Sequence, residues 1–98
     1  MIIVTIERYC QPGNEEQFRD LLIELRAMAM RQPGHISGAT LRELFNPSLF
    51  KVISTWTSLE AWRTWQESSQ RLLIEEKLNS ITMHGNKIRI FAVDLEIK

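Results

Sequence analysis

The residues of this chain best suited to ligand chemistry are its three tryptophans. Trp56, Trp62 and Trp65 all fall within ten positions of one another. An indole ring is large, flat and amphipathic, so it can form the wall of an aromatic pocket. Trp56 and Trp65 are candidates to wall a binding site for a small aromatic molecule between a helix and a sheet. The alternative is that all three tryptophans only pack that helix onto the sheet.

Three polar side chains are further candidates. Arg42 is expected in the middle of a largely buried strand, where it would either hold an oxyanion or form a salt bridge to Glu43 or Glu7. His35 and His84 are the only imidazoles, and each can titrate near neutral pH. Both occupy loop-like positions, which indicates solvated surface side chains. No residue is identified as the catalytic base.

Other common site chemistries lack support in the sequence. Two histidines without a paired carboxylate at suitable spacing predict no metal site, and there is no glycine-rich phosphate loop or dinucleotide fingerprint. Cys10 is the only cysteine, so it predicts an inert thiol in a reducing cytoplasm. The run Glu75-Glu76-Lys77 is typical of a solvated helix face.

The bulk composition narrows the function classes. Twelve basic and twelve acidic residues leave no net charge, which argues against nucleic acid as a partner. No apolar run approaches the roughly 18 residues that a membrane span requires, and no basic region precedes the first apolar run. We therefore expect one cytoplasmic domain over residues 1–98, without a membrane partner.

The hydrophobic periodicity predicts the elements of the first half. Residues 2–9 alternate as a strand, and a helix follows the break at Pro12-Gly13, with Asn14 and Gln17 as its capping box. That helix ends at Pro33-Gly34. Two strands, 36–45 and 50–56, then form a hairpin around a turn at 46–48.

The second helical region is predicted to be broken near Ser68-Ser69. Leu59, Trp62 and Trp65 share one helical face, and the face carrying Ile74, Leu78 and Ile81 is rotated from it by roughly 130°. Since one straight helix cannot aim both faces at one core, we expect a helix from a capping box at Thr57–Glu60 to about Gln66, and another to about Met83.

The last predicted element is a strand over residues 88–97, with a bulge or two-sided burial at Ile90-Phe91. The order is therefore β-α-β-β-α-β, an α+β ferredoxin-like fold with a four-stranded antiparallel sheet. Both helices would cover one face of the sheet. Because the other face also carries apolar residues, we expect a homodimer that packs sheet against sheet.

The chain resembles the antibiotic biosynthesis monooxygenase (ABM) family of dimeric α/β barrels. The matching segments are Pro12-Gly13, Pro33-Gly34-His35-Ile36, Asn46-Pro47, Trp56-Thr-Ser-Leu-Glu-Ala-Trp62 and Trp65. Their order and spacing, which span nearly the whole chain, carry the resemblance.

The resemblance implies oxidation of hydroquinones or polycyclic phenols by molecular oxygen without a cofactor. Haem-degrading relatives use an Asn in strand 1, a Trp in the second helix and a His about ten residues later. Trp65 matches that Trp, but Glu75 stands where the His would be, and strand 1 offers Glu7 and Arg8. We therefore expect no haem. The function expected is a cofactor-independent monooxygenase; the alternative is a non-catalytic dimeric module that binds a small ligand or serves as a scaffold.

Overall fold

Four strands form one antiparallel sheet in this computed structural model, which describes residues 1–94. The strands are β1 (Ile2–Tyr9), β2 (His35–Arg42), β3 (Leu49–Trp56) and β4 (Lys87–Ala92), and they lie in the order β2-β3-β1-β4. The sequentially distant strands β1 and β3 are therefore central neighbours.

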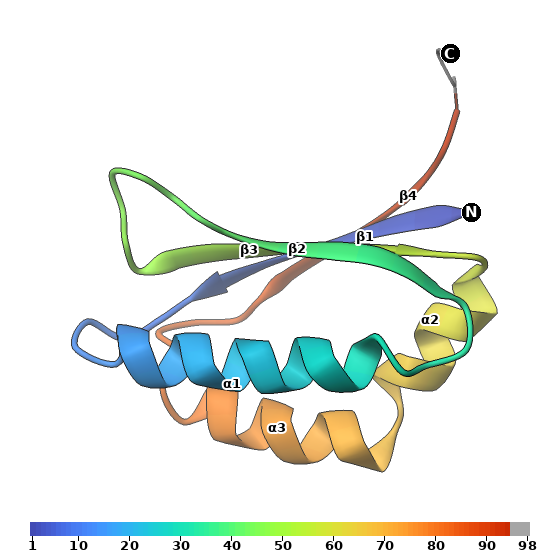
Figure 1. Cartoon of the computed structure of the whole chain (residues 1–98). Coiled ribbons are helices and arrows are strands. Elements are labelled where there is room, and N and C mark those ends of the chain that lie inside the picture. The colour runs from blue at the N-terminus through green and yellow to red at the C-terminus, as the bar shows by residue number, and fades with distance from the viewer. Residues whose placement is uncertain (95–98) are drawn as a thin grey trace.

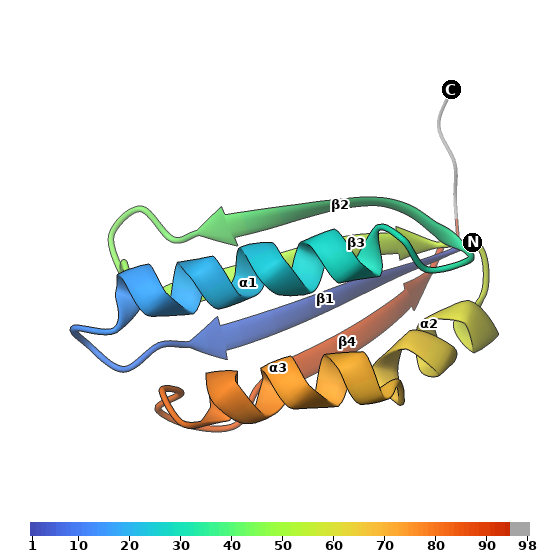
Figure 2. The ribbon, with the colours of Figure 1, turned by 60° about the horizontal axis from the view of Figure 1, so that its bottom comes forward.

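Three helices cover one face of this sheet, as Figures 1 and 2 show. They are α1 (Glu15–Ala29), α2 (Leu59–Gln66) and α3 (Ser69–Asn79). This arrangement confirms the predicted ferredoxin-like fold, with the second helix divided into two. No helix within residues 1–94 has both the length and the apolar character that crossing a membrane requires.

The break between α2 and α3 lies where the change of helical phase predicted it. The Ser68 hydroxyl caps α3 by accepting a hydrogen bond of 3.3 Å from the Arg71 amide. The break lets the α2 tryptophans and the α3 side chains Ile74 and Leu78 all enter one core. The predicted extension to Met83 was wrong, because α3 ends at Asn79.

Both predicted helix caps need correction. Helix α2 is capped by Ser58 and not by Thr57, since the Ser58 hydroxyl accepts a hydrogen bond of 3.2 Å from the Ala61 amide. Asn14 does occupy the N-cap of α1, but its side chain makes no capping hydrogen bond. The carboxylate of Glu15 instead accepts a hydrogen bond of 2.8 Å from the Gly13 amide.

Two strands also differ from their predicted extent. Strand β2 ends at Arg42 and not at Phe45, and its irregularity falls between His35 and Ser37. Strand β4 pairs with β1 without a bulge from Lys87 to Ala92, and all six of its residues are exposed. Neither the bulge nor the two-sided burial expected at Ile90-Phe91 is therefore present in the protomer. Residues 95–97 of the predicted strand lie outside the described part of the chain.

The alternation of β1 separates the two faces of the sheet. Val4, Ile6 and Arg8 point toward the helices and are buried. The core there also contains the three tryptophans and the apolar stripe of α1. On the opposite face, Ile3 pairs with Phe91 of β4, and no helix of the described chain covers this side (Figure 1).

Candidate functional site

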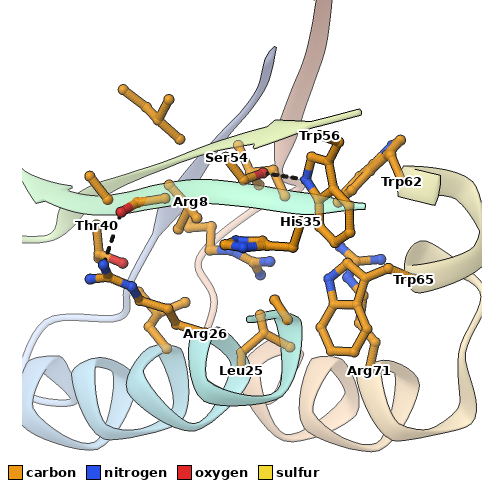
Figure 3. A pocket seen from close by; sticks show the side chains of 17 residues that line it. Arg8, Leu25, Arg26, His35, Thr40, Ser54, Trp56, Trp62, Trp65 and Arg71 are labelled. Atoms are coloured by element: carbon orange, nitrogen blue, oxygen red, sulfur yellow. Dashed lines mark hydrogen bonds between the residues drawn. The ribbon is translucent and has the colours of Figure 1, made fainter. Parts of the chain in front are cut away.

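A cavity of about 40 Å³ lies between the sheet and the helices. Figure 3 shows its labelled side chains reaching inward from both layers. Its aromatic lining comes from β3 and α2, and its polar lining includes four basic side chains, Arg8, Arg26, His35 and Arg71. The remaining lining is mostly aliphatic.

The aromatic part of the cavity is formed by all three tryptophans. Trp56 and Trp62 are in edge-to-face contact with ring centroids 5.9 Å apart, and Trp65 lines the same cavity from α2. The Trp56 indole N–H donates a hydrogen bond of 2.9 Å to the Ser54 hydroxyl, which fixes the orientation of the ring (Figure 3). The structure thus brings Trp56 and Trp65 together, and the same rings also belong to the core.

His35 lines this cavity, so the expectation of a solvated side chain was wrong for this residue. Its imidazole meets Trp56 edge to face with ring centroids 5.1 Å apart. Partial burial lowers the pKa of His35 below its usual 6.5, and the charge of Arg26 lowers it further. The imidazole is therefore neutral at pH 7 and is able to accept a proton. His84 lies outside the cavity, and its ring centroid is 4.1 Å from that of Tyr9.

A buried ionic cluster of Arg8, Glu75 and Arg71 adjoins the cavity. Arg8 binds the Glu75 carboxylate through two nitrogens, at 3.0 and 2.5 Å, and Arg71 approaches the same carboxylate at 3.3 Å. Burial alone would raise the pKa of Glu75, but the hydrogen bond from Arg8 and the two positive charges outweigh burial and lower it. Glu75 is therefore ionised, and the expectation of a solvated side chain was wrong for it.

A larger groove of about 320 Å³ lies beside the cavity, between α1 and β2. Leu22, Arg26 and Thr40 line both spaces. The guanidinium of Arg26 spans from α1 to β2 by donating a hydrogen bond of 2.9 Å to the Gly38 carbonyl. This side chain therefore lies at the boundary between the groove and the cavity.

Arg42 lines the groove and not the tryptophan cavity. It is the exposed last residue of β2, where the sequence had suggested a buried mid-strand position. Its Nε donates a hydrogen bond of 2.7 Å to the Pro47 carbonyl, and its guanidinium lies 5.1 Å from the ring centre of Phe50. Within the described residues neither Glu43 nor Glu7 pairs with it.

Sequence reasoning missed Arg8, Arg71 and Glu75 as functional candidates, and it interpreted His35 as a solvated surface side chain. The sequence did contain a signal for three of them. Arg8 continues the inward alternation of β1, and Arg71 and Glu75 fall four residues apart on the same face of α3 as Ile74 and Leu78. A charge at a core position of such a pattern predicts a buried and paired group. His35 gave no comparable signal, because the β2 irregularity sets its direction.

Two other expectations concern metal binding and the thiol. No group of three His, Cys, Asp or Glu side chains within residues 1–94 is placed to hold a metal ion. Cys10 is buried, and burial together with the nearby charge of Glu15 raises the pKa of its thiol. A protonated thiol is a poor nucleophile.

Comparison with known proteins places the chain within a family. The antibiotic biosynthesis monooxygenase family model matches residues 1–76. No curated protein matches the chain in sequence.

Several solved structures share the fold. A candidate antibiotic biosynthesis monooxygenase from Deinococcus radiodurans has a TM-score of 0.91 at 17% identity, over 100% of this chain and 97% of its own. SnoaB from Streptomyces nogalater, a cofactor-independent oxygenase, has a TM-score of 0.85 at 20% identity, covering 98% and 96%. A conserved protein from Methanosarcina mazei has a TM-score of 0.86 at 20% identity, covering 92% and 89%. At these identities the likeness concerns the fold alone.

Proposed function

The chain belongs to the antibiotic biosynthesis monooxygenase family, and from this premise we propose that it is a cofactor-independent monooxygenase acting on a small phenol or hydroquinone. The observation that carries the proposal is His35, a half-buried imidazole of lowered pKa set against Trp56 in a tryptophan-lined cavity. Support also comes from SnoaB, a cofactor-independent oxygenase of the same fold.

The first chemical step requires a base in an aromatic pocket. The tryptophans pack against the faces or edges of the substrate ring. The neutral imidazole of His35 accepts the phenolic proton, which converts the substrate to the electron-rich phenolate. The positive charges of Arg8 and Arg71 then stabilise the oxyanion in an environment that excludes water.

The overall reaction balances without a further reductant. A phenol with a free para C–H consumes one molecule of oxygen, gains one oxygen atom as the second carbonyl of a quinone and releases the other as water. The phenol supplies all of the electrons, so the protein contributes the proton acceptor and the pocket.

The size of the cavity determines how much of a substrate it accepts. A buried water molecule needs a cavity of about 10–15 Å³, so the cavity of 40 Å³ has room for about three water-sized groups. That suffices for a phenolic oxygen and its nearest ring atoms. The remainder of the ring extends into the 320 Å³ groove when Arg26, which lines both spaces, moves aside. Arg42 then contacts the outer part of the substrate.

The proposal includes a cytoplasmic homodimer made of the single domain 1–98. The sheet face opposite the helices presents Phe91, Ile3 and their neighbours without a covering helix among the described residues. Leu44 and Phe45, in the β2–β3 turn, are 87% and 91% exposed, and Figure 1 shows this turn rising on the same open side. A second copy of the chain would bury these apolar groups.

Oxygen uptake tests the proposed activity. Purified protein is supplied with a panel of phenols and hydroquinones in an oxygen electrode, against the same mixture without protein. We expect uptake above autoxidation, and a loss of at least about tenfold in the Trp65→Phe variant. One atom from ¹⁸O₂ should enter the quinone made from a phenol with a free para C–H, and one should enter as a ring hydroxyl when a hydroquinone is converted to a hydroxyquinone and water. If the protein binds these compounds but none of them gives oxygen uptake, the oxygenase is refuted and the protein is a ligand-binding module.

A further inference from the structure

The side chains that line the cavity and the groove are unusually one-sided in charge. Five of the chain's eight arginines line one or both of these spaces, together with His35. Within residues 1–94 no aspartate, glutamate or lysine lines either space. The five arginines are Arg8, Arg19, Arg26, Arg42 and Arg71. This asymmetry occurs in a chain whose net charge is zero.

The deepest part of the site keeps an uncompensated positive charge. Arg8 and Arg71 are 1% and 6% exposed and share one carboxylate, that of Glu75, so the three groups together carry one positive charge. A buried charge without a counter-charge is destabilising. The cluster is therefore complementary to one further negative charge.

Arg8 also has an unused donor. Its Nε–H is buried and has no hydrogen-bond acceptor within residues 1–94, and Arg8 lines the cavity from the sheet. Figure 3 shows its side chain extending from β1 toward the centre of the site. Buried N–H groups nearly always have an acceptor. An anionic oxygen in the cavity would supply both the acceptor and the charge.

The outer arginines extend the positive lining to the surface. Arg19, Arg26 and Arg42 lie within 4 Å of no carboxylate in the described part of the chain. Arg26 and Arg42 instead use guanidinium donors on backbone carbonyls. An approaching anion would therefore meet unneutralised guanidinium groups along the groove.

We propose that the cavity and groove form a binding site for an aromatic ring that carries an anionic oxygen group. The anionic oxygens lie against Arg8 and Arg71, and the ring lies along Trp56 and Trp65 toward Arg26. The assignment of the ring rests on the proposed function, whereas the preference for an anion rests only on the charges described above. Carboxylate and phenolate oxygens share this chemistry, and separate probes distinguish them.

Calorimetric titration with matched probes measures the preference directly. Benzoate is compared with benzamide, and 2-naphthoate with 2-naphthamide, in low-salt buffer at neutral pH. The amide keeps the shape of the carboxylate and removes its charge. We expect at least one carboxylate to bind about tenfold or more tightly than its amide, with an affinity that falls as salt is added. A further pair, ionised 4-nitrophenol and neutral nitrobenzene, tests whether the site also prefers a phenolate.

Variants locate the charge that is responsible. Arg26→Gln removes an outer charge without disturbing the buried cluster and should weaken carboxylate binding about fivefold relative to amide binding. Arg63→Gln, an exposed arginine of α2 that lines neither space, is the matched control and should change neither. Glu75→Gln removes the internal counter-charge and should strengthen carboxylate binding. If Glu75→Gln fails to fold, the comparison of Arg26→Gln with Arg63→Gln still tests the anion site.

Three outcomes would overturn the anion site: equal affinity for charged and neutral probes in every pair, no binding of any anionic probe, or no effect of Arg26→Gln. A different result would refute the proposed oxygenase activity. Turnover of neutral hydroquinones without an anion preference removes only the anion site, whereas carboxylate binding without oxygen uptake by any phenol removes only the oxygenase.

Discussion

At the scale of single residues, the site depends on one imidazole whose surroundings change its chemistry. A histidine next to a Pro-Gly turn would ordinarily be solvated and would titrate near pH 6.5. In this chain His35 lies against Trp56 and near Arg26, and both burial and the arginine charge favour the neutral form. The proposed base is therefore ready to accept a proton over the whole neutral range.

The pH dependence of turnover tests this assignment. Because the neutral imidazole is the active form, kcat/KM should rise with pH through a pKa below 6.5 and then stay level through pH 7. Arg26→Gln removes one cause of the lowered pKa, so the acidic limb should move to higher pH. His35→Gln should lower kcat/KM by about 10²-fold or more and abolish that limb.

His84→Gln is the control for this experiment, since its ring contacts Tyr9 outside the cavity. A wild-type acidic limb that persists in His35→Gln would assign the proton acceptor to another group.

At the scale of elements, the entry to β2 decides where His35 points. Gly34 has a φ of +89°, a backbone conformation that favours glycine. A Cβ at Gly34 would lie 2.5 Å from the Cβ of Ala61 in α2. The Gly34 carbonyl also accepts a hydrogen bond of 2.8 Å from the Thr57 amide. This close contact fixes the start of α2 against the start of β2, and so sets His35 beside the tryptophans.

Substitution of the two left-handed glycines should separate strain from contact. Gly13 has a φ of +95°, and a Cβ added there would meet no atom within 4 Å, so Gly13→Ala should cost only the backbone strain of about 1 kcal/mol. Gly34→Ala adds the clash with Ala61 and should cost roughly 2–4 kcal/mol. Urea unfolding of both variants measures the difference. Equal losses would show that the contact with α2 is not tight.

At the scale of the whole molecule, the fold has one covered and one uncovered sheet face. All three helices lie on the same side (Figure 1). Ile3 alternates with the buried residues of β1 and pairs with Phe91, so both side chains face the other side. Phe91 is 48% exposed. An apolar sheet face of this kind is typical of an association surface, and the proposed two-fold dimer would bury it.

A charge on the open face should dissociate this dimer. We expect the wild-type chain to migrate at twice 11.5 kDa in sizing chromatography, and Phe91→Asp to migrate as a folded protomer, because an aspartate would be buried without a partner. Leu73→Asp, at a 64% exposed position of α3 on the helical side, is the control and should remain dimeric. A monomeric wild type would refute the dimer.

The fold of this chain could be predicted from its sequence. The β-α-β-β-α-β order, the covered helical face and the break near Ser68 all followed from periodicity, because the spacing of apolar residues is a local property that directly reflects burial. The Trp56–Trp65 segment was recognised because its three tryptophans fall within ten positions. Exact helix caps and the end of β2 did not follow, since several neighbouring residues were equally able to cap or to pair.

The polar contents of the site, in contrast, depend on tertiary packing. Arg8 and Glu75 lie 67 positions apart in the chain, and their pairing requires β1 and α3 to pack on one another. The direction of His35 depends on Gly34, on Ala61 of the following helix and on an irregular strand pairing. Periodicity tells which residues are buried, but the partner of a buried charge is set by long-range packing, and that partner determines its chemistry.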